Sequence, residues 1–150
     1  MFRIMFVCLG NICRSPMAEY MLKSKLSSRG ITSVEVASAA TSDEEVGNPV
    51  YPPAKALLKS KGIDCSEKRA RQLQKSDGDK FDLFICMDSR NVRHAKAILG
   101  EANADKCVKM LSFVHSDADV ADPWYTRDFE TCYNDIERGL DALLETLPKE

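Results

Sequence analysis

Residues 4–16 of the chain read IMFVCLGNICRSP, an apolar run followed by a glycine, an asparagine and a serine–proline pair. The run over residues 4–7 is short and unbroken, which is typical of a strand buried on both faces of a sheet. Ser15 and Pro16 are favoured at the cap and first turn of a helix. The stretch therefore predicts a strand, a tight turn and a helix, with Cys8 at the carboxyl end of the strand.

The rest of the chain continues this alternation of strands and helices. Further strands are predicted at residues 34–37, 83–87 and 108–111, the last from a weaker pattern. Helical patterns include Ala18, Leu22 and Leu26; Ala54, Leu57 and Leu58; residues 89–99; and an apolar stripe over residues 129–147. We expect a single α/β domain over residues 1–150, with a four-stranded parallel sheet flanked by helices on both faces. Ligands of such sheets bind beyond the carboxyl ends of the strands, where Cys8 falls.

Composition excludes several classes of protein. The formal charge of −2 gives no broad basic field for nucleic acid. The amino-terminal apolar run is broken by Gly10, and no stretch approaches the roughly 18 apolar residues of a membrane span, so we expect a cytoplasmic protein. The six cysteines include no C-x-x-C pair, so neither a zinc site nor any other metal or cofactor is expected. Cys86, Cys107 and Cys132 are interpreted as small buried hydrophobic residues.

A cysteine followed six residues later by an arginine occurs three times, as Cys8 with Arg14, Cys65 with Arg71 and Cys132 with Arg138. The third pair lies inside the long helical stripe, and no strand leads into the second. Only the first pair follows a buried strand and precedes a helix. Only there do Gly10 and Asn11 supply residues that tolerate a left-handed backbone. The 8–14 loop is therefore the candidate site.

The 8–14 loop has the features of an anion site. Successive N–H groups that turn inward, closed by a helix amino terminus, bind a phosphate. The loop residues predicted to surround it are Leu9, Gly10, Asn11, Ile12, Cys13 and Arg14. The same field favours the thiolate form of Cys8, to which Ser15 can donate a hydrogen bond. The planar fork of Arg14 matches two phosphate oxygens. A nucleophile beneath a clamped phosphate requires no metal.

Residues 7–16, VCLGNICRSP, followed by MAE, resemble the active-site loop of the low-molecular-weight protein tyrosine phosphatases. Similar segments follow in the family's order: SAATS (38–42), GNP (47–49), ARQ (70–72), CMD (86–88) and DPWY (122–125). The resemblance implies a flavodoxin-like fold. It also implies hydrolysis of phosphotyrosine in proteins or peptides, and of small aryl phosphates, through a cysteinyl-phosphate that releases inorganic phosphate. We expect a monomer or weak dimer.

The resemblance assigns further roles. Asp122 corresponds to the family's general acid, which later activates water; a proton donor to the leaving oxygen is typically worth about 10²–10⁴ in rate. Trp124 and Tyr125 are expected to wall the pocket against the aromatic ring of the substrate. Cys13 corresponds to the neighbour that can form a reversible disulfide with the nucleophile Cys8.

Asn11, Ser15 and Ser38 are expected to support the loop without touching phosphate. Some family members place a histidine behind the loop asparagine, where this chain has Lys68. The sequence leaves open how Asn11 is held.

The chain departs from the family's pattern at two further positions. Glu44 stands where many animal members carry an aromatic residue on the opposite pocket wall, within an acidic run, residues 43–45. We therefore expect discrimination against acidic phosphopeptides. Thr126 replaces the usual glycine after the segment at residues 122–125, which predicts a differently shaped loop.

Other interpretations of the same loop fit the residues less well. Phosphoarginine phosphatases place threonine after the loop asparagine, whereas this chain has Ile12. Thiol-dependent arsenate reductases resemble it at Cys86 but need a further cysteine where Arg93 stands. A silent phosphate-binding module would not need an intact nucleophile, clamp and acid. A Cys–His protease needs a positioned histidine, whereas His94 and His115 are expected to be solvated. The Gly-Lys-Ser/Thr of P-loop NTPases is missing.

Overall fold

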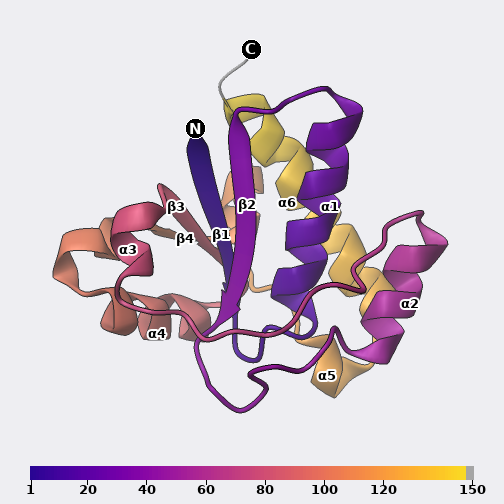
Figure 1. Ribbon diagram of the computed structural model, residues 1–150, viewed down its shortest axis with the longest axis horizontal. Coiled ribbons are helices and arrows are strands. Elements are labelled where there is room, and N and C mark those ends of the chain that lie inside the picture. Colours follow the sequence, from indigo (N-terminus) through magenta and orange to yellow (C-terminus); the bar gives the residue numbers. More distant parts are fainter. Residues whose placement is uncertain (148–150) are drawn as a thin grey trace.

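The computed structural model describes residues 1–147 and contains one four-stranded parallel sheet (Figure 1). The strands are β1 (Phe2–Cys8), β2 (Val34–Ala40), β3 (Leu83–Cys86) and β4 (Cys107–Lys109), in the order β2-β1-β3-β4. Strand β1 lies inside the sheet, with Cys8 beside Ala40 of β2 and Val7 beside Cys86 of β3. The predicted four-stranded parallel sheet is confirmed.

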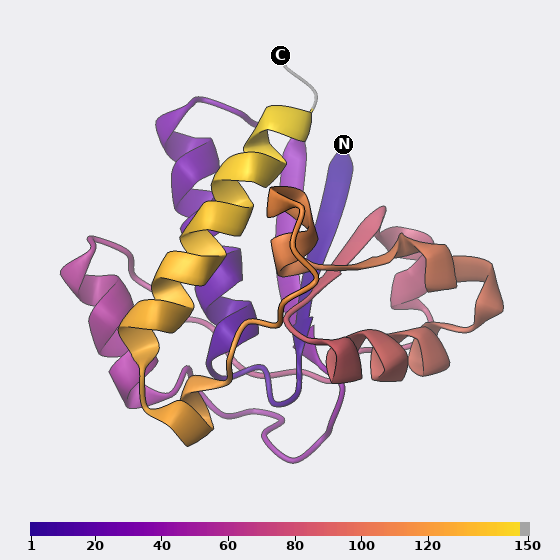
Figure 2. The same ribbon diagram turned by 180° about the vertical axis from the view of Figure 1, so that it is seen from behind.

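Helices cover both faces of this sheet. They are α1 (Arg14–Ser28), α2 (Pro52–Ser60), α3 (Asp77–Lys80), α4 (Ser89–Leu99), α5 (Pro123–Thr126) and α6 (Phe129–Thr146), with the 3-10 helices η1 (Glu101–Lys106) and η2 (Met110–Val114). Helices α1 and α6 lie side by side on one face, and α3 and α4 lie on the other (Figures 1 and 2). This confirms the predicted α/β architecture with helices on both sides.

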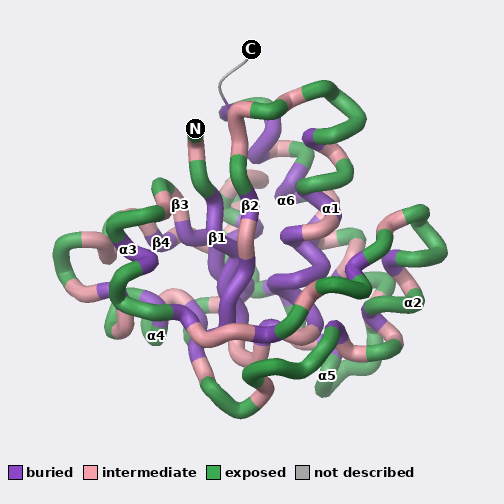
Figure 3. Tube along the Cα trace, in the orientation of Figure 1, coloured by how far each residue is buried: buried purple, intermediate pink, exposed green. Residues whose placement is uncertain are grey.

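The central strand explains why its sequence is apolar without alternation. Ile4 and Phe6 pack into the cluster formed with α1 and α6, whereas Met5 and Val7 pack into the cluster formed with α4. All four side chains are fully buried. Because both faces of β1 are covered, neither set of alternate positions tolerates a polar residue. Figure 3 shows this buried stripe running through the centre of the molecule.

The predicted fourth strand over residues 108–111 is wrong at its carboxyl end. Strand β4 ends at Lys109, and Met110 and Leu111 begin η2. Met110 lies against α6 at Gly139, where a Cβ atom would stand only 2.9 Å from the Met110 carbonyl oxygen. The apolar residues after β4 therefore serve contact with α6, and not an extension of the edge strand.

The predicted start of the first helix is also wrong. Helix α1 begins at Arg14, and its N-cap is Cys13, whose side chain makes no capping hydrogen bond. Ser15 lies inside the first turn, with its hydroxyl directed to the Cys8 sulfur. Strand β3 ends one residue before the predicted boundary, at Cys86, and α6 ends at Thr146. The one-turn helices α3 and α5 were not predicted because a single turn has no apolar periodicity.

Three segments converge at the carboxyl edge of the sheet, at the bottom of Figure 1. The 8–14 loop leaves β1, the Thr41 N–H donates to the Cys8 carbonyl (2.9 Å), and the Val120 N–H donates to the Met87 carbonyl (2.8 Å). These bonds bring the segments that follow β2 and η2 to the loop.

Two sequence interpretations are confirmed by burial. Cys86, Cys107 and Cys132 are buried, and His94 and His115 are exposed. Over residues 1–147, the structure has no helix that is both long and apolar enough to cross a membrane.

Candidate active site

The 8–14 loop reverses direction at Asn11. Asn11 has φ +59°, and it is one of three non-glycine residues with positive φ among residues 1–147. This places the Asn11 N–H 3.3 Å from the Cys8 sulfur, to which it donates. Gly10 does not adopt a left-handed backbone, so the predicted role of Gly10 in the turn is wrong. Gly10 instead lies beneath the Glu45 side chain, whose Cγ would be 3.4 Å from an added Cβ.

Ser15 and Asn11 together orient a proton toward the Cys8 sulfur. The Ser15 Oγ lies 2.9 Å from the Cys8 Sγ, and it accepts a hydrogen bond from the Asn11 Nδ2 at 2.8 Å. The amide occupies a lone pair of the hydroxyl oxygen, which leaves the hydroxyl proton free to point at sulfur. Cys8 therefore faces two donors, the Asn11 N–H and the Ser15 hydroxyl.

The carbonyl groups of the loop are bound from outside. The Leu9 carbonyl accepts from the Ser42 N–H (3.1 Å), and the Ile12 carbonyl accepts from the Tyr51 N–H (2.8 Å). With its carbonyl oxygens held outward, a tight loop presents N–H groups to its concave side.

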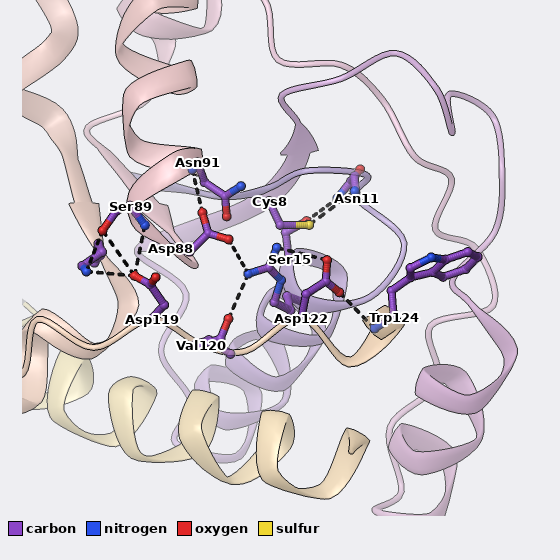
Figure 4. Close-up of polar contacts among 12 residues, drawn as sticks. Cys8, Asn11, Ser15, Asp88, Ser89, Asn91, Asp119, Val120, Asp122 and Trp124 are labelled. Carbon is purple, nitrogen blue, oxygen red and sulfur yellow. Dashed lines mark hydrogen bonds and ion pairs between the residues drawn. The ribbon is translucent and has the colours of Figure 1, made fainter. Parts of the chain in front are cut away.

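Arg14 is buried, with 3% of its side chain exposed, and two groups hold one of its nitrogens. Its Nη1 donates to the Asp88 Oδ2 at 2.8 Å and to the Val120 carbonyl at 2.9 Å (Figure 4). Burial alone would lower the pKa of Arg14, but the neighbouring Cys8, Asp122 and Asp88 raise it above its ordinary value. The guanidinium is therefore a fixed cation with donors left over on its other nitrogens.

Asp122 approaches this arginine from the loop after η2. Its Oδ2 lies 3.5 Å from the Arg14 Nη2, and its Oδ1 accepts from the Trp124 N–H at 3.0 Å. The second contact makes Asp122 the N-cap of α5. Asp122 thus stands at the mouth of the loop, with one oxygen anchored and the other near the cation.

A pocket of about 130 Å³ opens between these groups. Its lining includes the predicted loop residues except Asn11, together with Ser42, Glu44, Glu45, Asp122, Trp124 and Tyr125. The structure therefore brings Cys8, Arg14 and Asp122 together with all three residues expected to wall the pocket. Asn11, Ser15 and Ser38 are buried behind it, as expected of supporting residues.

A buried polar chain holds Asn11 from behind. The Asn11 Nδ2 also donates to the Ser38 Oγ at 2.9 Å, and the Ser38 hydroxyl donates to the Glu19 Oε1 at 2.6 Å. The Asn11 Oδ1 accepts from the Arg71 N–H at 3.1 Å. All the polar atoms of the Asn11 side chain are therefore engaged, which fixes the loop residue that has the unusual backbone conformation.

Lys68 is the last member of this series of buried polar contacts, and its position shows how Asn11 is supported. Its Nζ lies 3.2 Å from the Glu19 Oε1 and donates to the Ser38 carbonyl at 3.0 Å. The ammonium thus neutralises a carboxylate that is only 5% exposed and binds the main chain of the residue that contacts Asn11. Burial lowers the pKa of Lys68 below its ordinary value, although Glu19 opposes that effect.

Cys13 lines the same pocket but is 4% exposed. Burial raises the pKa of its thiol, and the neighbouring Cys8 and Asp122 raise it further, so Cys13 stays protonated while Cys8 faces two donors. Its redox pairing with Cys8 stays a prediction.

Three groups of this site were not predicted from the sequence. Asp88 had no assigned role, although its position between a predicted strand and a predicted helix could have marked it, because its Oδ1 caps α4 by accepting from the Asn91 N–H. Glu19 is a carboxylate one helical turn beyond Ser15, a spacing that places both on one side of α1. The Val120 carbonyl is a main-chain group, which side-chain patterns cannot reveal.

Comparison with known proteins agrees with this geometry. Residues 3–150 match the family model described as low molecular weight phosphotyrosine protein phosphatase. The chain belongs to that family. YfkJ of Bacillus subtilis, described as a low molecular weight protein-tyrosine-phosphatase, is 35% identical over 100% of this chain and 98% of its own length. The earlier resemblance is thereby confirmed.

Solved structures of the family superpose on this chain. The crystal structure of YfkJ from Bacillus subtilis has a TM-score of 0.93 at 36% identity, covering 97% of this chain and 94% of that one. SP-PTP of Streptococcus pyogenes has a TM-score of 0.88 at 38% identity, covering 100% and 95%. The fold is flavodoxin-like, and the chain is a phosphatase enzyme whose family implies phosphoprotein substrates.

The Lys68 contacts predict a role in activity that Lys23 does not share. Both lysines pair with Glu19, but Lys23 is 44% exposed and has no contact with Ser38 among its hydrogen bonds. We expect Lys68→Met to lower kcat on p-nitrophenyl phosphate roughly tenfold. This is the lower end of the loss seen when residues that orient the ligands of metal sites are removed. Lys23→Met should leave kcat unchanged, and equal rates for both variants would contradict the role.

The lowered pKa of Lys68 sets the direction of a pH effect. The ammonium is present below that pKa and is lost as pH rises through it, so the wild type should lose activity at alkaline pH. Lys68→Arg keeps its charge throughout. In a profile of kcat against pH, the fall in activity at alkaline pH should therefore occur at a higher pH for Lys68→Arg than for the wild type.

Proposed function

We propose that this phosphatase hydrolyses phosphotyrosine in proteins and peptides, with Cys8 as nucleophile, Arg14 as phosphate clamp and Asp122 as general acid and base. The single observation that carries the proposal is the pair of donors at the Cys8 sulfur: the Ser15 hydroxyl at 2.9 Å and the Asn11 N–H at 3.3 Å. Two hydrogen-bond donors at the sulfur favour negative charge there, and a nucleophilic cysteine attacks as the anion.

The proposed reaction has two steps. The Cys8 thiolate attacks phosphorus, the bond from phosphorus to the phenolic oxygen breaks, and the Asp122 carboxylic acid gives its proton to that oxygen. Water then attacks the cysteinyl-phosphate, Asp122 accepts the water proton, and inorganic phosphate leaves with the thiolate restored. The 3.5 Å approach of Asp122 to Arg14 supports the proposal that the acid and the arginine act on the same phosphate.

The hydrogen-bond donors of the 8–14 loop and of Arg14 support phosphate as the bound group. The carbonyls of Leu9 and Ile12 are held from outside by Ser42 and Tyr51, so the loop N–H groups are left for an anion. Arg14 adds the donors that Asp88 and Val120 do not use. Spreading the dianion over these fixed donors stabilises the charge on the phosphate oxygens in the transition state. A cytoplasmic location, which this proposal keeps, would maintain Cys8 in its reduced form, without a disulfide.

The aromatic side of the pocket supports a phenolic substrate. Trp124 and Tyr125 line the pocket and are 43% and 74% exposed, which is unusual for large side chains unless they meet a partner. An aromatic ring entering above Cys8 would bury part of this surface.

Two variants test the assignment. Cys8→Ser should lose all measurable hydrolysis of phosphotyrosine peptides while still binding phosphate, because the loop donors remain. Asp122→Asn should lower kcat/KM by about 10²–10⁴, most strongly for poor leaving groups. Circular dichroism controls for folding.

The assignment fails if Cys8→Ser keeps near-normal turnover. Phosphoarginine, assayed in parallel, tests the rival substrate. A higher kcat/KM for phosphoarginine than for phosphotyrosine would move the substrate assignment to the guanidino phosphate.

The acidic rim of the pocket predicts peptide selectivity. Glu44 and Glu45 both line the pocket, and Asn48 fixes Glu45 by donating to its Oε2 at 2.6 Å. We expect basic phosphopeptides to be preferred to acidic ones. Glu44→Gln should reduce that preference in kcat/KM by about twofold to fivefold, the scale of a screened surface charge.

Glu145→Gln, near the carboxyl end of α6 and outside the pocket lining, is the matched control and should leave the preference unchanged. The preference should also shrink at high ionic strength. Equal kcat/KM values for acidic and basic peptides in the wild type would refute the role of Glu44.

A further inference from the structure

The helix that carries Asp122 has little anchorage in the core. Helix α5 is a single turn in which only Pro123 is buried, whereas Trp124 is 43% and Tyr125 74% exposed. Asp122 itself is bound by its own helix and by the 3.5 Å contact with Arg14. The position of α5 relative to the 8–14 loop must therefore depend on contacts at its surface.

Arg127 ends α5 in a conformation that is costly for a residue with a Cβ. Its φ is +61°, in the left-handed region that glycine adopts freely. Its side chain folds back over the helix: Nη1 donates to the Trp124 carbonyl at 3.3 Å, and Nη2 donates to the Tyr51 hydroxyl at 3.1 Å. The guanidinium carbon also lies 5.3 Å from the Tyr51 ring centroid and 5.5 Å from that of Phe129.

Tyr51 connects this arginine to the 8–14 loop. The Tyr51 ring packs on Trp124 with centroids 4.7 Å apart, and on Phe129 with centroids 6.2 Å apart. The main-chain N–H of the same residue donates to the Ile12 carbonyl at 2.8 Å. One residue thus contacts the loop through its backbone and the segment carrying Asp122 through its side chain.

We propose that Arg127 is a positioning residue for Asp122, acting through Tyr51. The Arg127–Tyr51 clamp, defined by the hydrogen bond and ring contact between these two residues, holds α5 against the 8–14 loop. It thereby sets the distance from the Asp122 carboxyl to the leaving oxygen. This inference rests on the proposed role of Asp122 as general acid.

Because the backbone of Arg127 has a positive φ, one substitution can remove the Arg127–Tyr51 clamp without straining the fold. Glycine suits a φ of +61°, so Arg127→Gly removes the side-chain contacts while relieving the backbone. Its melting temperature should stay close to that of the wild type. Truncation at most other positions would instead damage the fold and the clamp together.

The test measures kcat/KM for a series of aryl phosphates whose leaving groups range from good to poor. A misplaced acid slows departure of poor leaving groups most, because these need the proton most. We expect Arg127→Gly to lower kcat/KM about fivefold for the poorest leaving group, which corresponds to about 1 kcal/mol, and to change it little for the best. Tyr51→Phe, which loses only the hydroxyl, should fall between wild type and Arg127→Gly.

His115→Gly is the matched control. His115 also has positive φ, +60°, but lies outside the pocket lining, so its replacement should leave the whole series unchanged. The proposed role of Arg127 is refuted if Arg127→Gly has the same kcat/KM as the wild type for the poorest leaving group while Asp122→Asn has a lower one. An equal loss for every leaving group would also refute it, since that pattern reports damage to the phosphate site. An Asp122→Asn variant as active as the wild type would instead overturn the proposed function.

Discussion

The site depends on one residue held in a backbone conformation that is uncommon for residues other than glycine. Asn11 takes a left-handed backbone, and its side-chain amide is bound by Ser15, Ser38 and the Arg71 main chain. These bonds over-determine the turn, as a strained backbone at a functional site requires. Because the turn is fixed, the sulfur of Cys8 and the loop N–H groups keep their relative positions before any phosphate arrives.

The second constraint is the burial of charge around this turn. Arg14, 3% exposed, is compensated by Asp88 and Asp122, and Glu19, 5% exposed, by Lys68. Buried ion pairs contribute little net stability, because desolvation offsets their attraction. Their value here lies in geometry: a guanidinium held by Asp88 and a main-chain carbonyl cannot swing away from the 8–14 loop. Electrostatic preorganisation of this kind is a major source of catalysis in general.

Much of the fold and part of the site could be predicted from residues alone. The unbroken apolar run over residues 4–7 predicted a buried strand of a parallel sheet, and the strand–turn–helix context separated Cys8 from the competing cysteines. Asp122, Trp124 and Tyr125 were found only through the family resemblance, since an Asp-Pro pair is otherwise an ordinary turn. The resemblance placed Lys68 behind Asn11, but the sequence did not show how the two are connected, because the connection runs through Ser38 and Glu19, which are distant from Lys68 in sequence. The mistaken helix cap at Ser15 has a related cause: its hydroxyl is used by the Cys8 sulfur.

A crystal structure of this chain with vanadate tests the central claim most directly. Vanadate adopts the five-coordinate geometry of phosphoryl transfer and forms a bond to a thiolate at its apex. We expect a vanadium–sulfur bond to Cys8, with vanadate oxygens bound by N–H groups of the 8–14 loop and by the Arg14 guanidinium. Vanadate bound elsewhere, with the 8–14 loop empty and the Cys8 sulfur turned into the core, would contradict the claim.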